Sequence, residues 1–259
     1  MKPRLGRAPL FLASLTCVLG ACMAGRAPGL WASSVTYALH FDRAGVSDLP
    51  DGGFSTTTAE GLEVRLHRGY LLQSSLTLVD CLGVGGDAWD DYMASLLTVP
   101  LARAGHTGSA DPSELIRPRF LDLATADGDL EFGTVTMPEA RYCRVHHLVA
   151  GSYDEAAIEG PLPEGVDPIL TTLVLEGEWR SAGGDWAAFD ARSTLSSGAL
   201  HDLPDVLEGG LDGSHATVTV SRDLARMFDG VDFDAEPERT VLRNLVVDAP
   251  VAVRVDPEE

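Results

Sequence analysis

The sequence contains few basic residues. Its 259 residues include 19 Lys and Arg against 39 Asp and Glu, which gives a formal net charge of −20 at pH 7. Proteins that bind nucleic acid neutralise phosphates with Lys and Arg, so this balance argues against a nucleic-acid partner. The acidic residues are scattered in ones and twos along the chain, which is typical of a solvated acidic surface.

The sequence also lacks the short motifs of common enzymes and metal sites. It has no G-x-S-x-G, H-E-x-x-H, H-x-H or C-x-x-C, and its glycines match no phosphate-binding loop. Its carboxylates are too dispersed to nominate a catalytic pair. We therefore expect that the protein is not an enzyme.

Long apolar runs are confined to the N-terminus, where residues 1–24 are organised as a secretory signal. Lys2, Arg4 and Arg7 precede an apolar stretch that is too short to span a bilayer. The stretch ends in LGAC, which resembles a bacterial lipobox with Cys22 as its cysteine. We expect residues 1–21 to be a signal peptide and Cys22 to carry diacylglyceryl and palmitate chains. Cleavage by an ordinary signal peptidase nearby is the alternative.

The residues after the leader divide into a tether and one domain. Residues 22–34 are rich in Gly, Ala and Pro, which cannot bury enough surface to order themselves. Residues 35–259 are expected to form a single domain, because 45% hydrophobic composition supplies one sizeable core. Met23, in place of Asp, resembles lipoproteins that are sorted to the outer membrane. The expected location is therefore the bacterial cell envelope, with the protein membrane-anchored by lipid.

Alternation of apolar and polar residues dominates the domain and predicts half-buried strands. The stretches that show it best are 35–42, 61–66, 70–81, 116–123, 141–149, 170–179 and 215–221. Gly69 is predicted to mark a bulge or bend. Residues 221–230 and 237–248 predict one or two short helices near the C-terminus, although the second stretch would also serve as an edge strand. Together these features predict a mainly all-β fold, an antiparallel β-sandwich.

Four stretches, taken in order, carry a resemblance to a known family. They are VRLHRGYLLQSSLTLVD (64–80), RFLDLATADGDLEFGTVTMPEARYCRV (119–145), LVLEGEW (173–179) and VTVSRDLARMFDGVDF (218–233). In this order they resemble the MbnP-like family of exported β-sandwich proteins, which are often lipoproteins and are associated with copper acquisition. The resemblance implies that copper, or a partner linked to a metal, is bound in the envelope.

The run RYCRVHHLVAG (141–151) places two histidines side by side. Successive side chains of a strand point to opposite faces, so His146 and His147 cannot hold one ion together unless a bulge intervenes. We expect the odd-numbered residues 143–149 to point inward and the even-numbered residues 142–148 to point outward. His147 is then predicted to be a hydrogen-bonded core histidine, with a ligand role as the alternative.

A metal site would have to combine histidines from different strands and loops, since imidazole suits copper or zinc. The candidates are His106, His146 and His201, of which His201 matches the later histidine segment of the resembling family. If they converge, the chain is an envelope-tethered binding protein for a metal ion or a metal-linked partner protein. If they do not, it is an interaction or structural module with no small ligand.

Cys81 and Cys143 are the two cysteines that remain once the leader and Cys22 are set aside. Export places them where a disulfide forms and persists. Such a bridge closes a loop of about sixty residues, which the chain-entropy account values at about 4 kcal/mol of stability. Two unpaired buried cysteines, or a metal-binding pair, are the alternatives.

The mature N-terminus is expected to be a lipid-modified Cys22. Mass spectrometry of protein extracted from its own membranes measures this, and Cys22→Ser should move the chain out of the membrane fraction. An unmodified Cys22, or a mature chain that starts elsewhere, would contradict the prediction.

Overall fold

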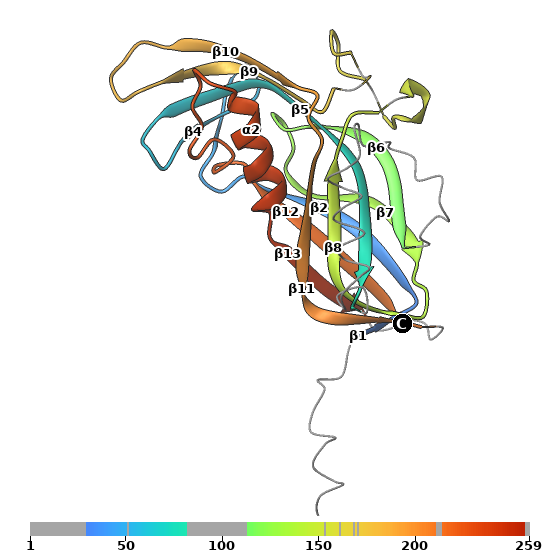
Figure 1. Ribbon diagram of the computed structural model, residues 1–259. Coiled ribbons are helices and arrows are strands. Elements are labelled where there is room, and N and C mark those ends of the chain that lie inside the picture. Colours follow the sequence, from blue (N-terminus) through green and yellow to red (C-terminus); the bar gives the residue numbers. More distant parts are fainter. Residues whose placement is uncertain are drawn as a thin grey trace, which may run out of the picture.

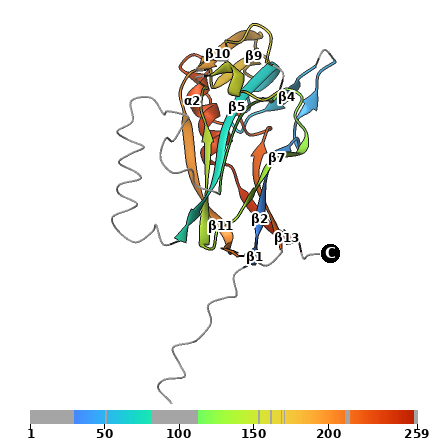
Figure 2. The same ribbon diagram turned by 90° about the vertical axis from the view of Figure 1, so that its right-hand side faces the viewer.

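Two β-sheets pack face to face in the computed structural model and form a β-sandwich-like fold (Figures 1 and 2). The structure describes residues 30–256 except 51, 82–112, 153, 161, 168, 170 and 211–213. Cys22 and His106 therefore lie outside the described residues. Within the described part, no helix is long and apolar enough to cross a bilayer. The prediction of a mainly β fold is confirmed.

The larger sheet has nine strands and the smaller sheet has four. The larger sheet consists of β1 (Leu30–Ala32), β3 (Ser47–Asp48), β4 (Phe54–Thr57), β5 (Glu63–Asp80), β6 (Glu114–Asp122), β8 (Arg141–Val149), β9 (Leu173–Arg180), β10 (Ala187–Ser193) and β11 (Ser197–Gly209). The smaller sheet runs in the order β13 (Val251–Asp256), β12 (His215–Asp223), β2 (Ser34–Asp42) and β7 (Gly128–Thr136). The strands begin at Leu30, inside the stretch predicted as tether, because Ala32 is buried and β1 pairs with β11.

The sheets are mixed and not purely antiparallel as predicted. Most neighbours are antiparallel, but β1 runs parallel to β11 and β2 runs parallel to β12. The strands of each parallel pair are far apart in the sequence, so no tight hairpin constrains their direction.

Strand β5 pairs with four other strands of the larger sheet. Its first half pairs with β4 and β9, and its second half pairs with β6 and β8. The sequence predicted two strands here, separated at Gly69. The structure has one strand with a bulge between Leu66 and Arg68, directly before Gly69, and a second bulge between Gln73 and Ser75. The predicted bend is therefore confirmed, although the strand does not break.

The core lies between the two sheets. Strand β2 places Val35, Tyr37, Leu39 and Phe41 in it, as the alternation predicted. The Tyr37 hydroxyl donates to the carbonyl of residue 113 at 2.6 Å and accepts the Leu78 backbone N–H at 3.0 Å. This phenol therefore links the smaller sheet to β5 without leaving a polar atom unpaired.

Near the C-terminus, only one of the two predicted helices forms. The second stretch forms α2 (Pro237–Leu242), which continues into the π-helix η4 (Arg243–Val247). The only other helical segment with described bounds is the 3-10 turn η3 (Glu155–Ala157). The prediction of a helix at 221–230 is wrong, because β12 runs to Asp223 and turns follow. The Asp223 carboxylate accepts the backbone N–H groups of Ala225 and Arg226, and these bonds favour a turn over a helix.

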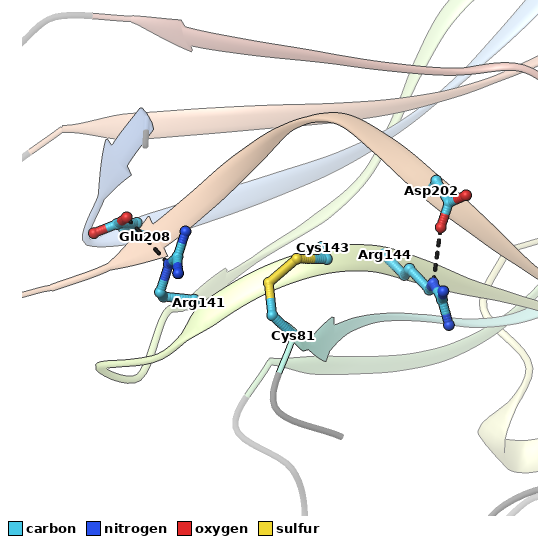
Figure 3. Close-up of a disulfide and its surroundings, with 6 residues drawn as sticks. All are labelled: Cys81, Arg141, Cys143, Arg144, Asp202 and Glu208. Carbon is cyan, nitrogen blue, oxygen red and sulfur yellow. Dashed lines mark hydrogen bonds and ion pairs between the residues drawn. A yellow bond between two sulfur atoms is a disulfide. The ribbon is translucent and has the colours of Figure 1, made fainter. Parts of the chain in front are cut away.

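The predicted disulfide is confirmed. Cys81 and Cys143 are bonded, with their Cα atoms 5.0 Å apart. Figure 3 shows the bridge between two ion pairs that connect β8 to β11, Arg141 with Glu208 at 3.3 Å and Arg144 with Asp202 at 2.7 Å. Strand β11 loses register between Asp202 and Leu207 and arches over Cys143. The bridge thus joins Cys81, the residue after β5, to Cys143 of β8, at the point where β11 loses its register with β8.

Candidate functional site

A polar cluster of three fully buried side chains lies between the sheets. Gln73 comes from β5 and His147 from β8, both in the larger sheet, and Arg222 comes from β12 in the smaller sheet. Arg222 Nη2 donates to Gln73 Oε1 and lies 2.9 Å from His147 Nε2. The cluster therefore connects the two sheets by hydrogen bonds inside the apolar core.

Side chains of β8 alternate between its two faces, and this alternation places His147 in the cluster. Val145, His147 and Val149 are buried and His146 is not, so the predicted faces are confirmed over this part of the strand. The prediction that Tyr142 points outward is wrong, because Tyr142 is buried. The ladder with β5 shifts register between Arg144 and Tyr142, and one extra residue in a strand reverses the faces beyond it.

Sequence reasoning missed Arg222. Strand β12 buries Val218, Val220 and Arg222 in alternation, so the same period of two that buries the valines also buries the arginine. The signal was present in HATVTVSR, but arginine is seldom fully buried without a partner and the residue was assigned to a helix.

Arg222 makes no ion pair with a carboxylate among the described residues. Its Nε and Nη1 atoms have no hydrogen-bond partner there, and its guanidinium lies 5.6 Å from the centre of the Phe41 ring. Burial lowers the pKa of Arg222 to about 9. Because this value is above 7, the group remains protonated at neutral pH. Its positive charge is buried with a hydrogen bond to Gln73 but without a carboxylate partner among the described residues.

Hydrogen bonds join Arg222, Gln73 and His147 to one another. Gln73 Nε2 donates to the carbonyls of Ser75 and Leu148, so Gln73 Oε1 is the atom left to accept from Arg222. His147 Nε2 lies 2.9 Å from Arg222 Nη2, a donor, and 2.9 Å from Gln73 Oε1, an acceptor. It accepts from Arg222 in one neutral tautomer and donates to Gln73 in the other. The expectation of a hydrogen-bonded core histidine is confirmed, and its Nε2 atom is engaged in either tautomer.

His201 lies next to this cluster on β11. Its ring centre is 6.0 Å from that of His147, and the two rings are tilted by 34°. The side chain is half-buried, and its Nε2 atom is buried without a partner among the described residues. The backbone of Val246, in the π-helix η4, interacts with both imidazoles. Single π-helical turns are frequent at functional sites.

Both histidines are held in the neutral form. Burial lowers the pKa of His147 well below 6.5, and the charge of Arg222 acts in the same direction, with smaller contributions from His201 and His146. Burial also lowers the pKa of His201, while the Val246 backbone and Asp202 act against it. Neutral imidazole is the form that binds metal ions.

The two predicted metal candidates that the structure describes, His146 and His201, do not converge. His146 lies on the face of β8 opposite to His147, and His201 lies on the His147 side, so these two candidates point apart. His106 lies outside the described residues. Within the described ranges, no group of three or more His, Cys, Asp and Glu side chains is placed to hold a metal ion.

Comparison with protein-family models, with curated proteins and with solved structures finds no match to this chain.

The buried His147 predicts that stability falls on acidification. Its pKa is depressed in the folded state, so below about 6.5 the unfolded state binds the additional proton and unfolding is favoured. We expect the free energy of unfolding of the wild type, measured in urea, to fall more steeply between pH 6.5 and 5 than that of His147→Gln. His40→Gln, at a half-buried histidine on β2, serves as the control. Parallel profiles for wild type and His147→Gln would contradict this assignment.

Proposed function

We propose that this chain is an exported, lipid-anchored binding protein of the bacterial envelope, of the MbnP-like type, and that it is not an enzyme. Three features support the proposal. The leader ends in a lipobox-like sequence at Cys22, the fold is a β-sandwich as the resemblance implies, and the Cys81–Cys143 bridge suits an oxidising compartment. The membrane is the first partner, through the lipid at Cys22, and a protein of the envelope is the second.

The side chain that carries the binding proposal is His201. Burial lowers the pKa of its ring, and its Nε2 atom has no hydrogen-bond partner within the described residues. The residue is half-buried but Nε2 itself is buried, so a metal ion would reach it only when the edge of the core opens. An unpaired buried nitrogen is costly unless something binds it. Copper fits an imidazole nitrogen of this kind. His147 does not contribute, because its Nε2 atom is engaged by Arg222 and Gln73.

His201 supplies one ligand, so a metal bound there would share its remaining ligands with water or with a partner protein. This arrangement suits the transfer or capture of copper linked to a partner more than permanent storage. The charge of Arg222 opposes a second cation, and a divalent ion meets twice the repulsion of a monovalent one. Monovalent copper is therefore the favoured ion.

The second candidate function is an interaction module with no small ligand. Trp31 favours it, since this large residue is 57% exposed on β1, within the stretch that was predicted as tether. Exposed aromatic residues are enriched in protein interfaces.

Copper titration separates the two candidates. We expect the full mature protein to bind monovalent copper under anaerobic conditions, in competition with a chromophoric chelator, and to bind zinc more weakly. His201→Ala should remove the binding. His146→Ala is the matched control, because this histidine lies on the opposite face of β8, and it should bind as the wild type does. Equal binding by wild type and His201→Ala, or no binding by the wild type, would contradict the copper proposal and favour the interaction module.

A further inference from the structure

A small polar pocket lies on the outer face of the larger sheet, away from the buried cluster of Gln73, His147 and Arg222. Its volume is about 180 Å³, and its lining includes Ser47, Ser55, Thr57, Glu63, Arg65 and Trp186. Pockets for drug-sized ligands measure roughly 300 to 1,000 Å³. This pocket therefore suits a smaller molecule, of about one ring.

The register of three neighbouring strands brings these side chains together. Ser47 of β3 lies opposite Ser55 of β4, and Ser55 lies opposite Arg65 of β5. Thr57 and Glu63 form the next pair. Paired residues of adjacent strands share a face, and residues two apart on a strand do so as well. Hydroxyl, carboxylate and guanidinium groups are thus presented together on rigid sheet backbone.

Trp186, in the connection between β9 and β10, forms the wall of the pocket. The guanidinium of Arg65 lies 4.0 Å from the centre of the indole ring and that of Arg180 lies 4.4 Å from it. Arg180 is itself held by Glu63, through two hydrogen bonds to Oε2 of 3.1 Å and 2.5 Å. The indole is therefore fixed in place before any ligand arrives, which reduces the entropic cost of binding.

The pocket offers both donors and acceptors for hydrogen bonds. Glu63 Oε1 accepts no hydrogen bond from the described residues, since both Arg180 bonds go to Oε2. Arg65 has a loose ion pair with Glu178, at 3.7 Å, and no hydrogen bond within the described part of the chain. Glu63 opposes an anionic ligand and Arg65 opposes a cationic one. A neutral molecule whose groups both donate and accept fits this set.

We propose that this pocket, the Trp186 pocket, binds a single neutral sugar ring of an envelope saccharide. Sugar hydroxyls match the free Glu63 oxygen, the Arg65 donors and the pocket hydroxyls, and Trp186 is held beside these groups by Arg65 and Arg180. The β4, β9 and β10 end of the molecule lies opposite to β1 (Figure 1). A chain anchored through residues before β1 thus presents the pocket away from its anchor. The inference goes beyond the proposed function and needs neither lipid nor copper.

Saturation-transfer NMR on the full mature protein tests the proposal, with glucose, galactose, mannose and N-acetylglucosamine as probes. We expect at least one of these sugars to bind. Glu63→Gln and Trp186→Ala should each weaken its binding by about tenfold or more, because each removes a main contact. Glu63→Gln preserves the size of the side chain, so the test remains decisive where Trp186→Ala fails to fold.

Two control variants test whether sugar binding depends on the pocket and not on the rest of the surface. Trp31→Ala removes an exposed tryptophan at the opposite end, and Asp190→Asn changes a charge on β10; both should bind sugar as the wild type does. The proposal is overturned if no neutral sugar binds, or if binding persists in Glu63→Gln. Binding of acetate or ammonium in place of the sugars at this pocket would overturn it as well.

Discussion

The arrangement of polar groups in this core depends on the burial of one positive charge. Alternation along β12 places Arg222 between the sheets, and a shift of one residue would turn Val218 and Val220 out of the core as well. The charge is therefore tied to the register of the strand. Gln73 Oε1 accepts a hydrogen bond from it, which sets the orientation of the amide, and its charge adds to the effect of burial in lowering the pKa of His147.

This constraint also separates the roles of the histidines. Sequence spacing showed that His146 and His147 lie on opposite faces, but it did not show what each would meet. Arg222 and Gln73 engage Nε2 of His147, so His147 is part of the core, whereas Nε2 of His201, one strand away, has no partner among the described residues. The Cys81–Cys143 disulfide lies beside the arch of β11, the strand that carries His201.

The elements with regular alternation were predictable from the sequence. β2, β8 and the two halves of β5 were identified because apolar residues occupy every second position. β11 was missed because Asp202, Pro204 and Asp205 interrupt its pattern, and the arch over Cys143 is the structural counterpart of that interruption. The turns after Asp223 have the sequence pattern of a helix, since Leu224, Met227 and Phe228 are buried and are spaced as in a helix.

The functional groups were less predictable than the strands. Burial of Arg222 contradicts the general preference of arginine for the surface, and the Trp186 pocket depends on the pairing of β3, β4 and β5, which a single sequence does not reveal. The most direct test of the account is the free energy of unfolding of Arg222→Met, measured in urea. A buried charge without a carboxylate partner predicts a loss of no more than about 1 kcal/mol, or a gain. Methionine fills the space without a charge, and His147 Nε2 can then donate to Gln73 Oε1, which lies 2.9 Å away. A loss of about 3 to 5 kcal/mol, as expected when a buried ion pair is broken, would contradict it.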